Sequence, residues 1–157
     1  MDLDFQIFKK EDYAEYYSWF KDADLNEQLG PMKANDDEWL IHVLNEKNGC
    51  THSIFQNKQL VSVIGIAFPD NDNPAYGITS IAVKPSLRSR GIGKKILKDV
   101  MRLYPLRKGQ YWIVHVDSNN QKAKRFFEKN GWICVQTPPE NDNMFLLEYP
   151  QLHINKN

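Results

Sequence analysis

The segment from residue 81 to residue 95, IAVKPSLRSRGIGKK, constrains the fold of this chain more than any other stretch. It begins with apolar residues that are typical of a strand, is interrupted by Pro85, and then becomes basic and glycine-containing. A helical pattern begins at Ile92, because apolar residues recur from there on one face of a helix, at Ile96, Leu97, Val100 and Met101. The sequence therefore predicts a strand that leads through a tight turn into a helix.

The start of this helix is a predicted anion-binding site. The first backbone N–H groups of a helix have no partner within the helix and lie at the positive end of its dipole. A turn that contains Gly91 and Gly93 can approach a phosphate closely at that point. Basic side chains flank the two glycines, at Arg88, Arg90, Lys94 and Lys95. Together these features predict a phosphate site.

Two familiar nucleotide-binding motifs do not fit this segment. A P-loop requires Ser or Thr after its Lys and an earlier Gly, whereas Lys94 is followed by Lys95 and the earlier position holds Arg88. A dinucleotide-binding fingerprint requires a third Gly after Gly91 and Gly93, and it belongs to the first strand–helix unit of a domain. The segment therefore predicts neither kind of nucleotide site.

Hydrophobic periodicity along the whole chain predicts a mixed α/β fold. Strand-like runs are expected near residues 2–7, 50–55, 60–68, 76–83, 111–116, 132–136 and 144–149. Helical patterns carry Tyr16, Leu40, Leu97 and Phe126 on their apolar faces. The order of elements is thus β, α, α, β, β, β, α, β, α, β, β, with about seven strands and about four helices.

The predicted strand at residues 76–83 has an irregular pattern. Ile78 shares a face with Ser80, whereas Ile81 and Val83 share the other face. Either a bulge near Ser80 brings these aliphatic residues to one side, or helices cover both faces of the strand. A bulge would also expose backbone groups, which is common beside active sites.

The segment between the first two predicted helices is acidic. It contains Asp22, Asp24, Glu27, Asp36, Asp37 and Glu38. One interpretation is a solvated loop that leads into a helix N-terminus, and the other is one wall of a pocket for a cationic ligand.

A second motif lies at residues 120–132, NQKAKRFFEKNGW. Together with the Arg88-x-x-Gly91-x-Gly93 segment, these residues resemble the GNAT superfamily of N-acetyltransferases. The resemblance is close over residues 78–132, and the predicted order of elements is similar to that fold over almost the whole chain. It implies an α/β (α+β) fold in which the mixed, mostly antiparallel, twisted sheet has its fourth and fifth strands splayed apart.

The resemblance also implies that acetyl-coenzyme A binds between the splayed strands as the co-substrate. Its pyrophosphate is expected on the backbone amides of residues 88–93, which is the site predicted above from the helix terminus. Its pantetheine arm is expected to pair with the backbone of residues 81–83. The coenzyme-binding residues implied in this way are Ile81, Ala82, Val83, Arg88, Ser89, Arg90, Gly91, Ile92, Gly93, Lys94, Asn120 and Phe127.

The implied chemistry is the direct attack of an amine on a thioester, which requires a base for the amine and benefits from an acid for the thiolate. Family members commonly have a Tyr acid where this chain has Phe127, and some have a Glu where it has Gly77. Some aminoglycoside-modifying relatives have a carboxylate at the end of the fifth strand, and His115 and Asp117 occupy that region here, so the resemblance makes them the candidate catalytic residues. A His in a strand and an Asp before a helix are also common structural residues.

We therefore expect an acetyl-coenzyme A dependent N-acetyltransferase that acts on a primary amine of a small cationic molecule or of a peptide or protein. The missing Tyr and Glu leave one alternative, a non-catalytic acyl-coenzyme A binding module. Nucleic-acid binding is not expected, because Lys plus Arg and Asp plus Glu number 20 each and the net charge is zero.

Composition sets the remaining expectations. A chain of 157 residues, 41% of them hydrophobic, fits one domain over residues 1–157. Cys50 and Cys134 lie in strand-like runs without metal-ligand spacing, so we expect buried free thiols and no metal. The sequence shows neither a signal peptide nor an apolar run of membrane-spanning length. A cytoplasmic monomer or homodimer is expected, with surface or packing roles for the other histidines, His42, His52 and His153.

Overall fold

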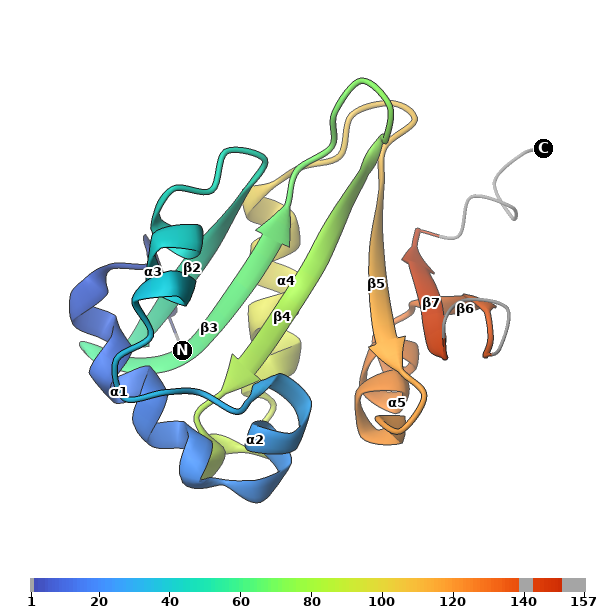
Figure 1. Cartoon of the computed structure of the whole chain (residues 1–157). Coiled ribbons are helices and arrows are strands. Elements are labelled where there is room, and N and C mark those ends of the chain that lie inside the picture. Colours follow the sequence, from blue (N-terminus) through green and yellow to red (C-terminus); the bar gives the residue numbers. More distant parts are fainter. Residues whose placement is uncertain (1, 139–142, 151–157) are drawn as a thin grey trace. The chain divides into compact units, whose positions relative to one another are not determined.

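A seven-stranded sheet with the strand order β1-β2-β3-β4-β5-β7-β6 organises the chain (Figure 1). The computed structural model describes residues 2–138 and 143–150. Strands β4 and β5 are parallel, and the pairs β1–β2, β5–β7 and β6–β7 are antiparallel, so the predicted mixed, mostly antiparallel sheet is confirmed. The strands are β1 (Asp4–Ile7), β2 (Gly49–Gln56), β3 (Gln59–Ala67), β4 (Ala75–Val83), β5 (Tyr111–Asp117), β6 (Ile133–Gln136) and β7 (Met144–Tyr149).

The described residues form five α-helices, one more than the sequence predicts. They are α1 (Tyr13–Ser18), α2 (Ala23–Leu29), α3 (Asp37–Leu44), α4 (Ile92–Leu103) and α5 (Gln121–Lys129). Short 3-10 turns precede α1, follow α1 and follow β4, at Lys10–Asp12, Trp19–Lys21 and Pro85–Leu87.

Helix α2 corrects the interpretation of the acidic segment as a plain loop. Asp22 caps the helix, because its side chain accepts a hydrogen bond of 3.0 Å from the backbone N–H of Leu25. Leu25 is the buried residue of this helix, so the sequence carries almost no apolar periodicity there. A short, capped helix with a single buried side chain gives a hydrophobic pattern too weak to detect.

Two compact units make up the chain. The first comprises residues 1–66 and 80–105, and the second comprises residues 67–79 and 106–157. The boundary falls inside β4, between Thr79 and Ser80. The expectation of one domain over residues 1–157 stays a prediction.

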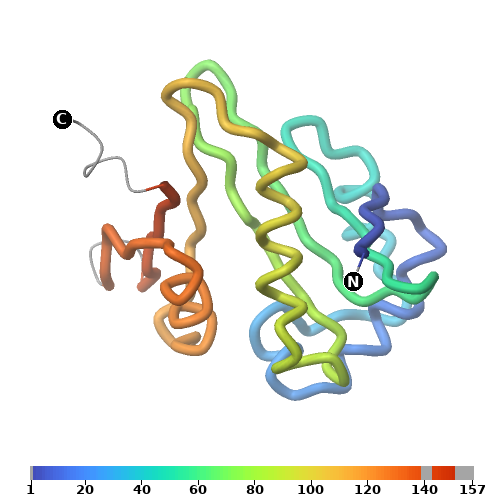
Figure 2. The backbone as a smooth tube through the Cα atoms, turned by 180° about the vertical axis from the view of Figure 1, so that it is seen from behind, coloured from blue at the N-terminus to red at the C-terminus, as the bar shows by residue number. Residues whose placement is uncertain are grey.

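In the first unit, helices pack on both faces of the sheet. Figure 1 shows α3 in front of β2, and Figure 2, seen from behind, shows α4 on the opposite face. The core under α1, α2 and α3 is largely aromatic. Its buried residues are Phe8, Tyr13, Tyr16, Trp19, Phe20, Leu25, Leu40, Leu60, Val63 and Ala82.

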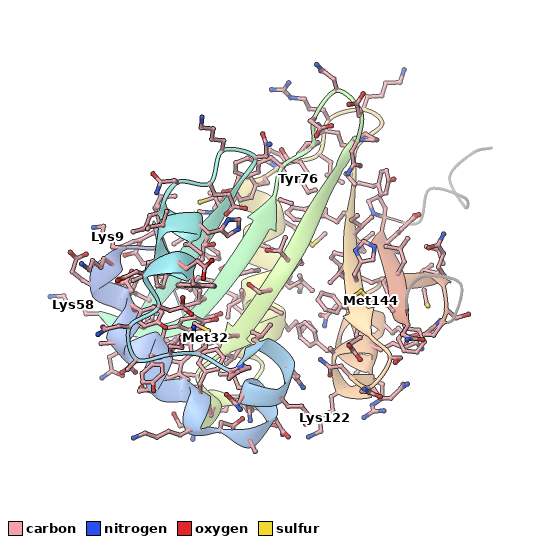
Figure 3. The ribbon with its side chains drawn as sticks, in the orientation of Figure 1. Lys9, Met32, Lys58, Tyr76, Lys122 and Met144 are labelled. Carbon is pink, nitrogen blue, oxygen red and sulfur yellow. The ribbon has the colours of Figure 1, made fainter. Side chains whose placement is uncertain are left out.

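The predicted hairpin at residues 50–68 is confirmed. Strands β2 and β3 are joined by the two residues Asn57 and Lys58, which have φ angles of 50° and 65°. Two consecutive left-handed residues are the signature of a type I′ turn, whose twist matches that of antiparallel strands. Lys58 is labelled in Figure 3.

Strand β4 begins in the second unit and ends in the first. A Cβ atom added to Gly77 would lie 3.5 Å from the Cβ of Ala67, so these two residues share a face. Ile78 and Ala82 are buried, whereas Ile81 and Val83 are half-buried. The bulge near Ser80 stays a prediction.

His52, for which the sequence predicts a surface or packing role, is a packing residue with a hydrogen-bonding partner. It is buried on β2, and its Nε2 lies 2.6 Å from the hydroxyl oxygen of Tyr104, the residue that follows α4. Burial holds the pKa of His52 below its ordinary value, because a charged imidazolium is poorly solvated there. The contact joins two segments that are 52 residues apart, which no local pattern reveals.

The second unit has α5 on one face of its strands. Lys124 of α5 lies over the ring of Phe145, with its Nζ 5.1 Å from the ring centroid. Phe145 is opposite Val116, so this face of β5 carries the buried residues Trp112, Val114 and Val116. The other face of β5 carries Ile113, His115 and Asp117.

Two expectations from composition can be compared with the described residues. Cys50 and Cys134 are free thiols, and both are half-buried rather than buried. Within residues 2–138 and 143–150, none of the helices has the length and apolar character needed to cross a membrane.

Candidate functional site: the N-terminus of helix α4 and the strands beside it

Helix α4 begins with an exposed, uncapped N-terminus. Its N-cap residue is Gly91, which has φ 77° and ψ 4° and therefore no side chain to accept from the first turn. The carbonyl of Gly91 accepts from Lys95 N–H at 3.2 Å, so the helical pattern starts at Ile92. The backbone N–H groups of a first turn have no partner within the helix. Because Ile92 is buried, its side chain fixes the helix start in the core while Gly91 stays exposed.

The turn before α4 leaves room around the helix terminus. Ser89 and Gly91 both have left-handed backbone angles, with φ of 62° and 77°. A Cβ atom added to Gly91 would meet no atom within 4 Å, so the space beside the helix start is open. Arg88, Ser89 and Arg90 are exposed. An anion can therefore approach the first-turn amides and the guanidinium groups from solvent.

Arg88 forms an ion pair with Asp22, the N-cap residue of α2. Its Nη2 lies 2.7 Å from Oδ2 of Asp22, the same oxygen that caps α2 through Leu25. The hydrogen bond from Arg88 is the largest cause that lowers the pKa of the Asp22 carboxyl, and the Leu25 N–H adds to it. The predicted anion loop is thus attached to the acidic segment, a contact over 66 residues that no local pattern indicates.

We expect Asp22→Ala to lower the melting temperature by about 2–4 °C, since loss of a helix cap costs about 1 kcal/mol. The folded state holds the pKa of Asp22 below that of the unfolded chain. Its contribution is therefore complete above about pH 4 and is lost as the pH falls through the lower, folded-state pKa. Thermal unfolding at pH 7 and near pH 3 measures this difference.

The control for this experiment is Glu27→Ala, which removes an exposed carboxylate from the same helix. A gap between wild type and Asp22→Ala that stays the same at both pH values contradicts the assigned role of the carboxylate.

Strand β4 presents backbone groups on the side away from β3. Lys84 N–H donates to the carbonyl of Val61 at 2.9 Å, and the buried Ser62 hydroxyl donates to the carbonyl of Ala82 at 2.7 Å. In an antiparallel pair, backbone groups of alternate residues point to the same neighbour. Ala82 and Lys84 therefore point toward β3, and the N–H and C=O groups of Ile81 and Val83 point to the other edge of β4.

The pairing of β4 with β5 covers only the first part of each strand. It comprises the four residue pairs from Ala75 with Tyr111 to Ile78 with Val114. Strand β4 continues to Val83, and β5 continues to Asp117. The register ends two residues before Ser80, near which the sequence predicts a bulge.

The two candidate catalytic residues are both on β5. His115 and Asp117 are exposed and lie on the face of the strand opposite α5. Asp117 has a structural role, because its Oδ1 accepts from Asn119 N–H at 2.9 Å and its carbonyl accepts from Asn120 N–H. The sequence analysis names such a structural role as the alternative to catalysis for Asp117. Of the two residues, His115 is therefore the stronger catalytic candidate.

Asn120 and Phe127 have structural roles in the second unit. The Asn120 side chain caps α5, with its Oδ1 accepting from Ala123 N–H at 3.1 Å. Phe127 is only 2% exposed, and its ring centroid lies 5.0 Å from that of Trp132 and 5.2 Å from that of Phe126. A phenyl ring in this core has no proton to donate.

The predicted site residues divide between the two units. The first unit brings together the implied coenzyme-binding residues of β4 and of the start of α4, namely Ile81, Ala82, Val83, Arg88, Ser89, Arg90, Gly91, Ile92, Gly93 and Lys94. The second unit holds His115, Asp117, Asn120 and Phe127. Glu148 is a further candidate, a buried carboxylate on the same strand face as His115, and no sequence signal indicates it because only the β5–β7 register relates the two residues.

Comparisons with known proteins agree with this fold. A structure of the aminoglycoside acetyltransferase AAC(6')-Ib in complex with coenzyme A and kanamycin is similar, with a TM-score of 0.74, 16% identity and coverage of 94% of this chain and 93% of that one. The spermidine N-acetyltransferase SpeG chimera from Vibrio cholerae and hSSAT also has a TM-score of 0.74, with 12% identity and coverage of 94% and 93%. At these identities the likeness shows the fold.

Two further comparisons extend this result. Naa50 of Arabidopsis thaliana, in complex with the bisubstrate analogue CoA-Ac-MVNAL, has a TM-score of 0.65 and 16% identity, over 94% of this chain and 98% of that one. An uncharacterised N-acetyltransferase of Bacillus subtilis (strain 168), YfmK, is 22% identical over 143 residues, which cover 91% of this chain and 93% of that protein.

The sequence model of the acetyltransferase (GNAT) family matches residues 10–132. This match spans both motifs, at residues 88–93 and 120–132, and all the elements that carry the predicted site residues. The chain therefore belongs to the acetyltransferase (GNAT) family and is an acetyl-coenzyme A dependent acyltransferase.

Proposed function

We propose that this protein transfers the acetyl group of acetyl-coenzyme A directly to a primary amine of a small cationic molecule or of a peptide or protein. The observation that carries the donor half of the proposal is the N-terminus of α4. It combines an uncapped first turn, an exposed left-handed Gly91 and open space around it, next to exposed Arg88 and Arg90. Such a terminus binds a pyrophosphate through several N–H groups and a positive dipole.

The backbone of β4 is the proposed binding site for the pantetheine arm of the coenzyme. Ile81 and Val83 direct their N–H and C=O groups away from β3, where an extended amide-containing chain can hydrogen-bond to them as an added strand does. The amides of the pantetheine arm have this character. In this proposal the first unit holds the coenzyme through residues 81–83 and 88–94.

The reaction proceeds by addition and elimination. The acceptor enters as an ammonium group, loses one proton to a base, and uses the freed electron pair to attack the thioester carbon. A carbon–nitrogen bond forms, and the carbon–sulfur bond then breaks so that coenzyme A leaves as the thiolate. The second nitrogen-bound proton is transferred to the thiolate, which leaves an amide, free coenzyme A and one proton released by the base.

His115 is the proposed base. A neutral imidazole can take a proton from an ammonium group close to neutral pH, and the exposed position of His115 on β5 lets an acceptor reach it. Phe127 supplies no acid, so the thiolate leaves unprotonated and receives its proton from the amine or from water. A thiolate is a good enough leaving group for this route because thiols are far more acidic than alcohols.

The test is thiol release from acetyl-coenzyme A with three amines that represent the acceptors named for the similar structures. They are spermidine, kanamycin and a peptide of sequence MVNAL. Calorimetric titration with acetyl-coenzyme A measures donor binding separately. We expect donor binding together with thiol release that depends on at least one amine. Donor binding with no amine-dependent release from any of the three contradicts the proposed acceptor class.

A further inference from the structure

A buried carboxylate lies on the same face of the second unit as His115. Glu148 of β7 is only 9% exposed, and its Oε2 has no hydrogen-bond partner among residues 2–138 and 143–150. A buried polar atom that has no donor costs stability, because burial removes its contact with water. Such an atom in a native protein requires an explanation, and a role in binding or catalysis is one.

The strand registers place Glu148 in one row across four strands. Gly77 of β4 pairs with Ile113 of β5, Ile113 is opposite Glu148 of β7, and Glu148 is opposite Ile133 of β6. Directly opposite residues share a face, and an added Cβ on Gly77 would lie 3.9 Å from Ile113 Cγ1, which confirms that Gly77 is on it too. Within this row of described residues, Glu148 is the one that carries a charge.

His115 is the diagonal neighbour of Glu148. It is opposite Leu146, two residues from Glu148 on β7 and on the same face. Diagonal neighbours of this kind are about 7–8 Å apart, within reach of long side chains that converge on one group. The face is the one turned away from α5, and it also carries Asp117 and Met144, of which Met144 is labelled in Figure 3.

We propose that the ammonium group of the acceptor is bound between Glu148 and His115. One N–H donates to Oε2 of Glu148, which has no donor among the described residues, and another N–H donates to the imidazole of His115, which takes that proton. Glu148 is then a substrate-contacting residue that favours cationic amines and supplies the carboxylate that the Gly77 position lacks. This inference rests on the proposed function, because it assigns a residue to its acceptor.

The variant Glu148→Gln separates this role from a structural one. The amide keeps the shape of the side chain and removes its charge. We expect the KM for the amine to rise by about 10- to 100-fold, since a hydrogen bond to a charged group is lost. The dissociation constant for acetyl-coenzyme A stays unchanged. The melting temperature stays the same or rises by about 2–4 °C, because the variant removes a buried carboxylate whose Oε2 has no donor among the described residues.

The control is Glu128→Gln, the same substitution at an exposed carboxylate of α5 that pairs with Lys124. It is expected to keep the wild-type KM for the amine. The amine used is whichever of spermidine, kanamycin or the MVNAL peptide the wild-type enzyme turns over. A wild-type KM in Glu148→Gln overturns the inference. A lower melting temperature together with weaker coenzyme binding also overturns it, because that pattern indicates a structural role.

A second variant covers the case in which Glu148→Gln does not fold. Glu148→Asp keeps the charge and withdraws the carboxylate by one methylene, so the KM is expected to rise by less than in Glu148→Gln, by about 3- to 10-fold. An unchanged KM in this variant overturns the inference. Wild-type enzyme that binds acetyl-coenzyme A but turns over none of the three amines contradicts the proposed function itself, and it is recognised before any variant is made.

Discussion

Gly93→Asp is expected to weaken acetyl-coenzyme A binding by at least about 100-fold. The substitution places a carboxylate in the first turn of α4, where the pyrophosphate is proposed to bind. Two charges of the same sign about 4 Å apart repel by about 4 kcal/mol near a protein surface, and 1.4 kcal/mol corresponds to a tenfold change in affinity. The expected loss is therefore large even after partial screening by salt.

The same substitution is expected not to destabilise the protein. An acidic side chain in the first turn interacts favourably with the helix dipole, and replacement of a helical glycine also reduces the entropy lost on folding. Binding and stability should therefore change in opposite directions. Calorimetric titration with acetyl-coenzyme A and thermal unfolding measure the two quantities on the same preparation.

Gly93→Asn is the matched control, because it adds a side chain of the same size without the charge. We expect its affinity for acetyl-coenzyme A to fall by less than about tenfold, the effect of bulk alone. If Gly93→Asp binds the coenzyme as tightly as wild type, the anion site is wrong. An equal loss in both variants means that steric exclusion, rather than charge, explains the effect.

His115→Gln is expected to lower kcat for the amine by about 100-fold or more, the usual contribution of a general base. The side chain is exposed on β5, so glutamine can replace it with little change in packing. Acetyl-coenzyme A affinity should not change, because the proposed pyrophosphate site is formed by the start of α4. A base that must be unprotonated makes the wild-type rate fall toward acidic pH, and this fall should be lost in the variant.

Two companion variants sharpen this experiment. His42→Gln makes the same change at an exposed histidine of α3 and is expected to keep wild-type turnover. Asp117→Asn preserves an oxygen that can accept from Asn119 N–H, so it tests the charge of Asp117 without breaking the turn. Unchanged kcat and an unchanged pH profile in both His115→Gln and Asp117→Asn contradict the assignment of catalysis to this end of β5.

Local sequence signals predicted most of the elements. Gly91 and the apolar periodicity that begins at Ile92 predicted the start of α4. This signal is local, because the backbone groups at a helix terminus depend on residues within one turn of it.

The errors have a common cause. Helix α2 was missed because it buries only Leu25, and the contact of His52 with Tyr104 was not predicted because the two residues are 52 positions apart. The attachment of Arg88 to Asp22 spans 66 residues. Periodicity reports which face of an element is apolar, but it does not report which distant side chain lies across from a polar one.

The sequence by itself determined the family fold, the helix start at which the anion site is proposed, and the candidacy of His115, because each depends on neighbours along the chain. Only the tertiary structure decided that Asp117 serves a turn, that Phe127 belongs to the core, and that Glu148 shares a face with His115. The physical reason is the register of the sheet. A shift of one residue between β5 and β7 would turn Glu148 to the opposite face, and nothing in either strand alone fixes that alignment.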